Sequence, residues 1–520
     1  MTRRILILCL LGVSLCAAPA PAAKKPKLLL AVVFDQFRYD YLTRFAGNYT
    51  SGFARMLGSG ASFTDAHFIH YPTVTAVGHS TFLSGATPSL SGIIGNEWFD
   101  RESGKMVTSV SDPATQLLGA AEGRTGSSPR RLLVSTVGDE LKMSGKGTKV
   151  IGISIKDRAA ILPSGHMSDG AYWFDGTSGG WVSSTYYFSE LPAWVQELNK
   201  SRPADKYLGA EWRPVDGKAD STPFKKMSAT PDAAFYSSVD ATPYGNELIE
   251  SLAERAIAAE KLGQHPGTDV LAVSFSANDY VGHAVGPDAP QVRDMCLRSD
   301  RLLGKLLAFI DSQLGAGNFL LVLTADHGVA PVPEVNQARK MPGGRLTPRP
   351  LADAIERALT SKYGAGKWLV NSGEMPYLNR ELIREKKLNE AEVEQTAADA
   401  LRAQPHIARV YTREQLLNGW IAPDEMSRAV INGFYGPRDG DLFPIQEPYW
   451  IFGAGTTGTT HGTPYNYDTH VPIVFMGPGV KPGKYNRKVA VNDIATTLAA
   501  MLETEEPSGS VGTVLEEMLR

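Results

Sequence analysis

The chain has 520 residues, of which 43% are hydrophobic and 21% are charged, close to the composition of globular domains. This composition excludes disorder, collagen and coiled coil as the main architecture. The formal net charge of −3 gives no basic excess for nucleic acid or an anionic membrane surface, so neither is expected as a partner. The length suits about three ordinary domains, or one large domain with insertions.

The first residues have the pattern of an export signal. Two arginines precede an apolar run over residues 5–17 that is too short to span a membrane, and small residues follow it. We predict a signal peptide over residues 1–23, cleaved near Ala22 or Ala23, and a periplasmic or secreted mature chain without a stable membrane partner. Beyond this segment the sequence has one cysteine, Cys296, so we expect no internal disulfide and a buried thiol.

Short apolar runs that alternate with helical patterns predict an α/β fold. The runs typical of buried parallel strands are Leu28–Phe34, Val150–Ile155, Val270–Phe275, Phe319–Leu323 and Val471–Phe475. The helical patterns are Pro129–Met143, Tyr244–Leu262, Gln291–Leu314 and Leu351–Lys362. This alternation predicts a central, largely parallel sheet.

Two stretches interrupt the alternation. Residues 172–230 are rich in Trp, Tyr, Gly and Ser, and residues 330–450 combine helices with many loop signals. We interpret both as insertions on a single catalytic domain over residues 24–520. The aromatic residues of the first stretch, such as Trp173 and Trp181, form either a small core or the wall of a pocket.

Acidic and histidine side chains lie next to the ends of predicted strands. These residues are Asp35, Asp279, His283, Asp326, His327 and His461. Because ligands bind beyond the carboxyl ends of parallel strands, we expect the six side chains at one sheet edge. One metal ion takes about four ligands, so six suggest two ions. Imidazole and carboxylate without thiolate suit Zn²⁺ and tolerate Mn²⁺, Fe or Co, and two such ions can clamp a displacement at phosphorus.

Each of these six residues also has an ordinary structural interpretation. An aspartate after a strand is commonly a turn or helix-cap residue, and a histidine is commonly a hydrogen-bonded structural group. The recurrence of six such residues in one register favours the metal site.

The segment from Tyr71 to Thr81 is typical of a loop that turns into a helix. Backbone N–H groups at a helix start attract an anion such as phosphate. A threonine hydroxyl bound to a metal ion there has a lowered pKa and becomes a nucleophile. By this chemistry Thr73 and Thr75 are both candidates, and the alternative for either is a helix cap.

Several motifs occur together in a characteristic order: Val-Phe-Asp35-Gln, Tyr-Pro-Thr-Val-Thr75, Gly-Ile-Ile-Gly-Asn96, Asn-Asp279-Tyr-Val-Gly-His283, Ala-Asp326-His327-Gly and Thr-His461-Gly. In this order the sequence resembles the alkaline phosphatase superfamily, within it the threonine-nucleophile branch shared with type I phosphodiesterases and nucleotide pyrophosphatases. The resemblance runs from about Asp35 to about Pro478 and implies a three-layer sandwich with helices on both faces of the sheet.

Carried over motif by motif, the resemblance implies a role for each site residue. Thr75 rather than Thr73 would be the nucleophile, and Asn96 would donate a hydrogen bond to a phosphate oxygen. Two Zn²⁺ per chain would be held by two ligand sets, one of Asp35, Thr75, Asp326 and His327, the other of Asp279, His283 and His461. His79 aligns with a family position that is not a ligand, and we interpret it as structural.

Lys156 and Arg158 follow the predicted strand that begins near Val150. If the segment stays extended, the two cations face the same way. Two cations suit the dianion of a phosphate monoester better than the monoanion of a diester, although a solvated surface pair is the alternative. The segment resembles the Lys-x-Arg segment of threonine-dependent alkaline phosphatases. We therefore predict a phosphatase that hydrolyses small-molecule phosphate monoesters through a phosphothreonine intermediate.

Two further motif matches lack the structural context that their usual functions need. Gly453–Gly458 matches GxGxxG but precedes a poor helix start, and Gly176–Gly180 matches GxSxG without the strand, turn and helix of a nucleophile elbow.

The rival enzyme is a phosphodiesterase or nucleotide pyrophosphatase with the same metal site. The rival from another class is a non-catalytic periplasmic metal- or phosphate-binding protein. The sequence leaves the oligomeric state open.

Overall fold

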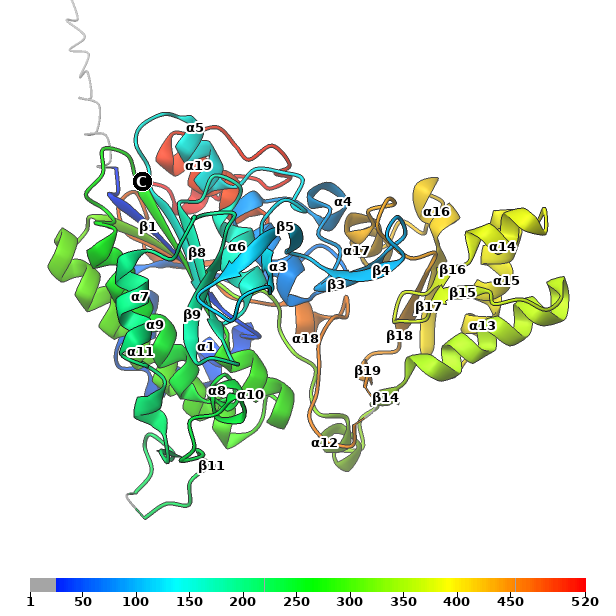
Figure 1. Cartoon of the computed structure of the whole chain (residues 1–520), viewed down its shortest axis with the longest axis horizontal. Coiled ribbons are helices and arrows are strands. Elements are labelled where there is room, and N and C mark those ends of the chain that lie inside the picture. The colour runs from blue at the N-terminus through cyan, green and yellow to red at the C-terminus, as the bar shows by residue number, and fades with distance from the viewer. Residues whose placement is uncertain (1–24, 219, 454) are drawn as a thin grey trace, which may run out of the picture.

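The computed structural model describes residues 25–218, 220–453 and 455–520, and these form an eleven-stranded sheet at the centre of the larger of two lobes (Figure 1). In order across the sheet the strands are β21 (Gly483–Ala490), β2 (Ala61–His67), β20 (Ile473–Met476), β13 (Phe319–Thr324), β1 (Leu28–Phe34), β12 (Asp269–Phe275), β7 (Val150–Ser154), β8 (Gly170–Asp175), β9 (Gly180–Ser184), β5 (Ser111–Leu118) and β6 (Thr125–Ser127). The predicted signal peptide lies outside the described residues. None of the helices within the described ranges has the length and apolarity needed to cross a membrane.

The middle of the sheet is parallel and buried. Strands β13, β1, β12, β7 and β8 run parallel to one another. Strands β1, β12 and β13 are buried along their whole length, because helices cover both faces and the runs are almost continuously apolar. Val33 pairs with both Ser274 and Thr324, and Ser274 pairs with Ser154. The carboxyl ends of four parallel strands therefore meet at one edge.

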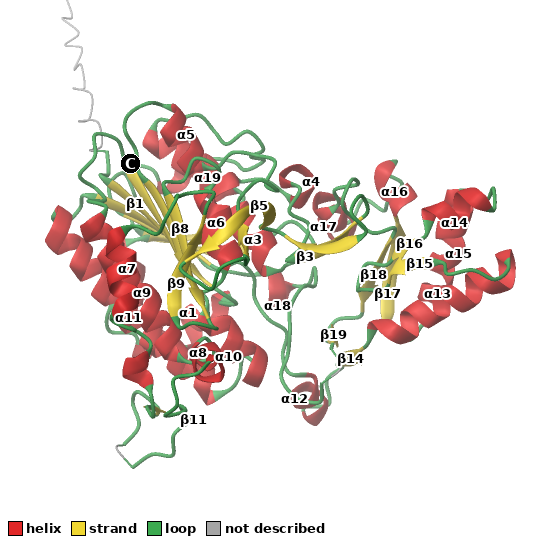
Figure 2. Ribbon diagram, viewed as in Figure 1, coloured by secondary structure: helices red, strands yellow, loops and turns green. Residues whose placement is uncertain are grey.

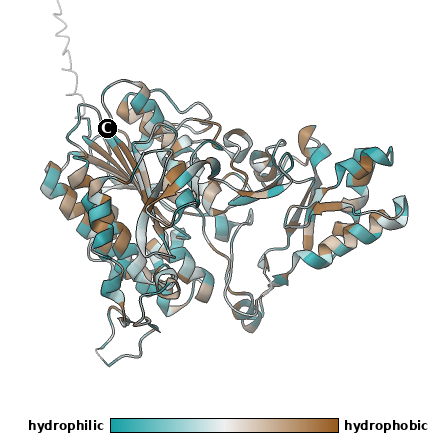
Figure 3. Cartoon of the chain, viewed as in Figure 1, coloured by the Kyte–Doolittle hydropathy of each residue, from teal (hydrophilic) through white to brown (hydrophobic). Residues whose placement is uncertain are grey.

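Helices form a layer on each side of the sheet (Figure 2). One group includes α1 (Tyr39–Arg44), α2 (Gly52–Ser59), α7 (Ala193–Lys200), α8 (Ala233–Val239), α9 (Pro243–Ala259), α10 (Ala277–Val285) and α11 (Pro290–Leu314). The other includes α3 (Thr75–Ser84), α4 (Pro88–Ser91), α5 (Val137–Met143), α6 (Asp157–Ser164) and α19 (Asp493–Leu502). The strands at the centre of the sheet are mostly brown in Figure 3, whereas the helices mix brown and teal. Buried apolar residues of strands and helices form one core cluster, and the predicted three-layer α/β fold is confirmed.

The smaller lobe is built mainly from one continuous stretch of the chain, shown in yellow and orange in Figure 1. With its connections it contains α12 (Pro333–Ala338), β14 (Gly344–Leu346), α13 (Pro348–Tyr363), β15 (Leu369–Asn371), β16 (Tyr377–Leu378), α14 (Arg380–Glu385), α15 (Glu390–Arg402), β17 (Ile407–Thr412), α16 (Arg413–Leu417), α17 (Glu425–Gly433), β18 (Leu442–Gln446) and β19 (Trp450–Phe452). Helices α13 and α15 pack on its short strands around Trp368 and Val393, in a hydrophobic cluster separate from the core of the sheet. The hairpin of β3 (Glu97–Asp100) and β4 (Lys105–Thr108) reaches toward this lobe from the sheet side.

The prediction of a parallel strand over Val471–Phe475 is wrong. Strand β20 is antiparallel to both of its neighbours, β13 and β2. The chain reaches it through the short helix α18 (Asn466–Thr469), where Asp468 O accepts a hydrogen bond from the N–H of Gly328, just beyond the end of β13. Since the chain enters from the carboxyl edge without a crossover to the other end, it must run back along β13.

Two other predicted boundaries are corrected. The helix expected from Pro129 begins only at Val137, where Thr136 and Asp139 form a capping box. Residues 170–184 form β8 and β9 of the central sheet, whereas the sequence pattern placed 172–184 in an insertion. Trp181 packs in the core of the sheet for that reason, and Trp173 is also buried.

Three minor sequence interpretations agree with the structure. Cys296 is a free and fully buried thiol. The GxSxG match is the turn between β8 and β9, which is not a nucleophile elbow. No helix begins within residues 455–465, so the described part of the GxGxxG match lies in a loop.

Candidate active site

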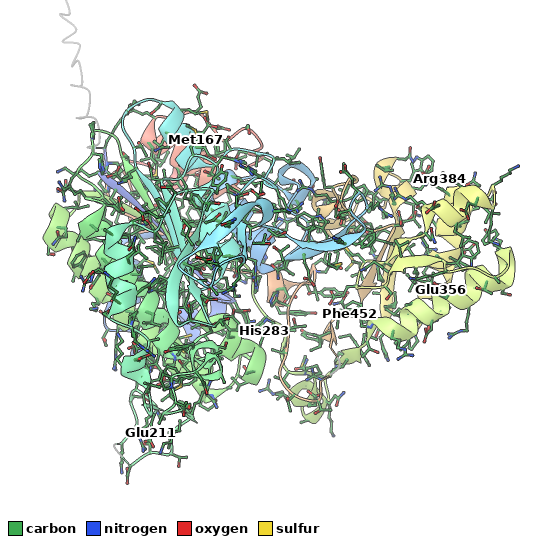
Figure 4. The ribbon with its side chains drawn as sticks, viewed as in Figure 1. Met167, Glu211, His283, Glu356, Arg384 and Phe452 are labelled. Atoms are coloured by element: carbon green, nitrogen blue, oxygen red, sulfur yellow. The ribbon has the colours of Figure 1, made fainter. Side chains whose placement is uncertain are left out.

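The carboxyl edge of the sheet brings the predicted site residues together. Asp35 follows β1, Asp279 and His283 lie on α10 after β12, and Asp326 and His327 follow β13. His461 comes from the loop before α18. The aspartates and His327 are buried, the side chain of His461 is 6% exposed and that of His283 is 35% exposed. Figure 4 shows His283 on the larger lobe, far from Glu356 and Arg384 of the smaller one.

The three site histidines present the same nitrogen to the centre of the site. Each Nδ1 lies within hydrogen-bond distance of a backbone carbonyl: His283 with Thr459 O at 2.8 Å, His327 with Gly328 O at 2.9 Å and His461 with Thr73 O at 2.8 Å. A carbonyl oxygen can only accept, so Nδ1 carries the proton and Nε2 keeps its lone pair in the neutral ring. Burial lowers the pKa of His327 to about 3, and burial with the neighbouring His327 lowers the pKa of His461. Such outer hydrogen bonds are typical of metal-ligating histidines.

The carboxylates leave buried oxygen atoms without partners. Asp35 Oδ1 and Asp326 Oδ2 have no hydrogen-bond partner among the residues that the structure describes. Burial and the nearby Asp35 raise the pKa of Asp326 well above its ordinary value. Burial opposes the charge of Asp279, but Lys156 and His283 outweigh it and hold its pKa well below the ordinary value. Orphaned buried oxygens are costly unless a cation completes them.

Two overlapping groups of ligand atoms have the spacing of a metal site. Asp35, Asp326 and His327 form one group, and Asp279, His327 and His461 form the other, each with its atoms within 4.8 Å of one another. His283 Nε2 lies 3.1 Å from Asp279 Oδ1, beside the second group. Oxygen and imidazole donors with fixed tautomers therefore fit divalent cations such as zinc.

Lys156 lies inside this cluster, and it corrects one prediction. Its Nζ donates to Asp35 Oδ2 at 2.7 Å and to Asp279 Oδ2 at 2.6 Å. Burial alone would lower the pKa of Lys156, but Asp279 and Asp35 outweigh it and raise the pKa. The segment does not stay extended, because β7 ends at Ser154 and Lys156 is the N-cap of α6.

Arg158 is the second residue of α6 and is part-buried. Its guanidinium has only a distant carboxylate neighbour, Asp157 at 3.9 Å, and its Nε has no partner among the described residues. Lys156 and Arg158 are therefore not on a strand, and the alternation of side chains along a strand does not bring them to the same side. The tight turn from β7 into α6 places both cations at the carboxyl edge of the sheet.

The structure separates the two candidate threonines. Thr75 is the first residue of α3, and its Oγ1 lies 3.4 Å from Lys156 Nζ and 3.5 Å from His327 Nε2. Thr73 Oγ1 instead donates to Thr463 O at 2.8 Å. The hydroxyl of Thr75 therefore faces the cluster, and that of Thr73 has a structural partner.

Asn96 lies just before β3 and contacts the start of α3. Its Oδ1 accepts a hydrogen bond from the N–H of Ala76 at 2.8 Å. This contact leaves the amide Nδ2 to donate to a bound oxygen beside Thr75. Asn96 is part-exposed, so a substrate can reach it.

Gln36 contributes to the site, and the sequence analysis missed it. Its N–H donates to Asp326 Oδ1 at 3.0 Å and its Nε2 donates to Asp279 Oδ1 at 2.7 Å. A Cβ on Gly282 would lie 1.8 Å from Gln36 Oε1, so a larger residue there would displace the end of the Gln36 side chain. Gln36 has a backbone φ of 59°. This conformation is seen only in the structure, so the sequence offered no signal for Gln36 beyond its position next to Asp35.

A second missed group holds the loop of His461. Asp468 Oδ2 accepts from the N–H of Thr463 at 2.8 Å and from its Oγ1 at 2.6 Å. The carbonyl of Thr463 accepts from Thr73, whose own carbonyl accepts from His461 Nδ1. A fully buried carboxylate thus fixes the direction of the imidazole through two threonines.

Comparisons with known proteins agree with this geometry. The family described as type I phosphodiesterase / nucleotide pyrophosphatase matches residues 29–470. Alkaline phosphatase PhoV of Synechococcus elongatus is 37% identical over 517 residues, with 95% of this chain and 93% of that protein covered. A protein of Myroides odoratus named calcium-transporting ATPase is 37% identical over 525 residues, with 95% of each covered.

A solved structure is similar over nearly the whole chain. The crystal structure of wild-type alkaline phosphatase PafA has a TM-score of 0.89 and 34% identity, and the match covers 96% of this chain and 100% of that one. The PafA sequence of Elizabethkingia meningoseptica is 35% identical over 522 residues, with 96% of this chain and 95% of that protein covered.

These matches define the class of protein. The chain belongs to the type I phosphodiesterase / nucleotide pyrophosphatase family. Its similarity to PhoV and PafA confirms the resemblance to the threonine-nucleophile alkaline phosphatases of that superfamily.

Proposed function

We propose that this chain is a metal-dependent phosphatase that hydrolyses small-molecule phosphate monoesters with Thr75 as nucleophile. Its likeness to alkaline phosphatases over most of its length supports a phosphatase, with phosphate esters as substrates. One observation carries the finer proposal. The Thr75 hydroxyl faces His327 Nε2 and Lys156 Nζ at the helix start where buried carboxylates converge.

The proposed metal centre uses the ligand sets implied by the family motifs. Two zinc ions, held by Asp35, Thr75, Asp326 and His327 and by Asp279, His283 and His461, would lower the pKa of the hydroxyl and neutralise charge on the leaving oxygen. The orphaned oxygens of Asp35 and Asp326 and the inward Nε2 atoms support this assignment.

The reaction has two displacements at phosphorus. Thr75 Oγ1 bonds to phosphorus as the ester P–O bond breaks, and the alcohol leaves with one proton. Water then attacks the phosphothreonine, restoring the Thr75 hydroxyl and releasing inorganic phosphate. Asn96, Lys156 and Arg158 donate to the phosphate oxygens in both steps.

Trapping the intermediate tests this assignment. The zinc-loaded enzyme is mixed with a phosphate monoester, quenched in acid and analysed by peptide mass spectrometry. We expect phosphate on Thr75, and a loss of turnover on the order of 10³-fold or more in Thr75→Ala. Thr81→Ala, which removes a buried hydroxyl of α3 that donates to Ala86 O, is the matched control and keeps a phosphorylated Thr75. Near-normal turnover of a folded Thr75→Ala would overturn the proposal, and metal binding without any turnover would favour the binding-protein alternative.

The choice between monoester and diester rests on Lys156 and Arg158. The two lie at the edge that carries Thr75, which supports recognition of a dianion. We expect Lys156→Ala/Arg158→Ala to reduce kcat/KM for a monoester by about 10²-fold or more and to spare the matching diester. The control is Lys200→Ala/Arg202→Ala, an exposed pair with the same spacing. An unchanged preference would favour the diesterase alternative.

We further propose that the protein acts after export, in the periplasm or outside the cell. The pattern of residues 1–23 supports this location. Mass spectrometry of the N-terminus of the secreted or periplasmic protein tests it. A chain that is found only in the cytoplasm, with residue 1 in place, would contradict it.

A further inference from the structure

A continuous chain of buried hydrogen bonds connects Lys156 to Thr75 behind the candidate active site. The N–H of Lys156 donates to Ser154 Oγ at 3.2 Å, and Ser154 Oγ lies 2.8 Å from Ser276 Oγ. Ser276 Oγ lies 3.3 Å from Ser274 Oγ, which lies 2.8 Å from His79 Nε2.

The chain ends at the residue proposed as nucleophile. His79 Nδ1 lies 2.9 Å from the carbonyl of Thr75 and 3.3 Å from Asp326 Oδ2. His79 comes one helical turn after Thr75 in α3, whereas Ser274 and Ser154 are register partners on β12 and β7. Three elements are therefore joined through one path.

The two ends determine the direction of every bond between them. The carbonyl of Thr75 can only accept, so His79 Nδ1 carries the proton and Nε2 of the neutral ring accepts from Ser274. Since Ser274 has used its only proton, it must accept from Ser276, which in turn must accept from Ser154. Ser154 then accepts from the Lys156 N–H, and each hydroxyl donates once.

The path is isolated from solvent. His79, Ser154 and Ser276 have no exposed surface, and Ser274 is 1% exposed. In such surroundings aligned hydrogen bonds strengthen one another, and a broken link leaves a polar group unpaired.

We propose that the chain His79–Ser274–Ser276–Ser154 is a positioning network that locks the Thr75 turn and the Lys156 turn into one rigid arrangement. The inference rests on the proposed roles of Thr75 and Lys156 at phosphorus, and it gives His79 a function beyond filling the core. Because near-attack geometry is sensitive to small displacements, a break in the chain reduces turnover more than substrate binding.

The first test removes one hydroxyl from the middle of the chain. Ser276→Ala touches neither Thr75 nor Lys156. We expect kcat for a phosphate monoester to fall about tenfold, with KM changed by less than about twofold. The matched control is Ser164→Ala, which removes an equally buried hydroxyl from α6 that donates to Ala160 O, outside the chain. Equal losses in the two variants would overturn the network.

A double-mutant cycle shows whether Ser276 acts through Lys156. In a Lys156→Ala background the backbone N–H that joins the network remains, but the ammonium group is absent. We expect Ser276→Ala to cost less than about twofold there, because the network acts by fixing that ammonium relative to Thr75. A full tenfold cost in that background would contradict the coupling. Melting temperatures of all variants identify losses that come from unfolding.

A spectroscopic measurement tests the direction of the chain without activity. We expect ¹⁵N NMR of histidine-labelled protein to show His79 protonated at Nδ1 only, with assignment by the loss of its signals in His79→Gln. Ser274→Ala should shift the Nε2 resonance of His79. A proton on Nε2 would overturn the assigned direction. If Thr75→Ala and Lys156→Ala both kept full turnover, the proposed function would fail while this tautomer stayed measurable.

Discussion

Among the residues that the structure describes, histidine and aspartate form two separate clusters, and the two differ in the partners that orient their side chains. The second cluster is Asp65, His67 and His470, whose ligand atoms also lie within 4.8 Å of one another. It lies at the end of β2, where His67 pairs with His470 in an isolated bridge. The residue types and spacing resemble those of the central site, so the difference must lie elsewhere.

The difference is the direction of the lone pairs. In the second cluster His67 Nε2 already bonds Asp65 Oδ1 at 2.7 Å, and His470 Nε2 bonds Thr64 O at 3.0 Å. The two rings stack 4.6 Å apart at 19°, and His327 and His461 also stack, 3.4 Å apart at 15°, so ring stacking does not distinguish the two clusters. A metal site needs outer partners that aim its ligands, and the central cluster has them.

The largest expected effect separates the two clusters by activity. We expect His461→Ala to lose bound zinc and to reduce kcat/KM on the order of 10³-fold or more, because one ligand set is broken. His470→Ala should stay within about twofold of the parent. Zinc content by atomic absorption and kinetics on a monoester measure both. Equal losses of zinc and of kcat/KM in the two variants would show that the clusters do not differ in metal binding.

Removal of the metal compares the two clusters by their effect on the free energy of unfolding. With zinc at about 1,000 times its dissociation constant, binding adds about 4 kcal/mol to the free energy of unfolding. We expect chelation to lower Tm by several degrees, since it leaves the buried carboxylates of Asp35 and Asp326 uncompensated. Calorimetry with and without chelator measures the shift. The His67→Ala control should show the same shift, and a reduced shift there would place a metal in the second cluster.

The outer partners of the central site give the next effect. Asp468→Ala removes the acceptor that holds Thr463, and thereby Thr73 and His461. We expect zinc affinity to fall by about 10- to 100-fold, as for other outer-shell changes. Competition with a zinc chelator measures the affinity. Asp65→Ala, from the second cluster, is the control and should leave it unchanged.

The smallest effect concerns His70, a buried histidine that belongs to neither cluster. Neither ring nitrogen has a hydrogen-bond partner among the described residues, and burial lowers its pKa to about 3. The unfolded chain takes up this proton near pH 6.5, so stability falls as the pH drops from 6.5 toward 3, by about 1.4 kcal/mol per unit.

His70→Phe should remove this loss. Urea unfolding at pH 7.5 and pH 5.0 compares the variant with the parent, and His406→Phe serves as an exposed control. An unchanged pH dependence in His70→Phe would show that the ring is protonated in the folded protein.

Much of the architecture follows from local patterns. Runs such as Leu28–Phe34 are apolar enough to be buried whatever surrounds them, and the amphipathic pattern of α11 persists over its full length. The direction of β20 could not be predicted, because it depends on which sheet edge the chain reaches after the smaller lobe. The turn at Lys156 was also missed, since a short polar segment after a strand can continue or bend.

The sequence by itself determined the class of fold, the carboxylates and imidazoles at one sheet edge, and the family. Only the tertiary structure decided how those groups point. It turned the Thr75 hydroxyl toward the cluster, gave the Thr73 hydroxyl a structural partner, oriented three histidines and joined Lys156 to Asp35 and Asp279. The physical reason is that these choices depend on hydrogen-bond partners far away in the chain. His461 and the carbonyl that fixes its ring are 388 residues apart, and no local pattern specifies such a contact.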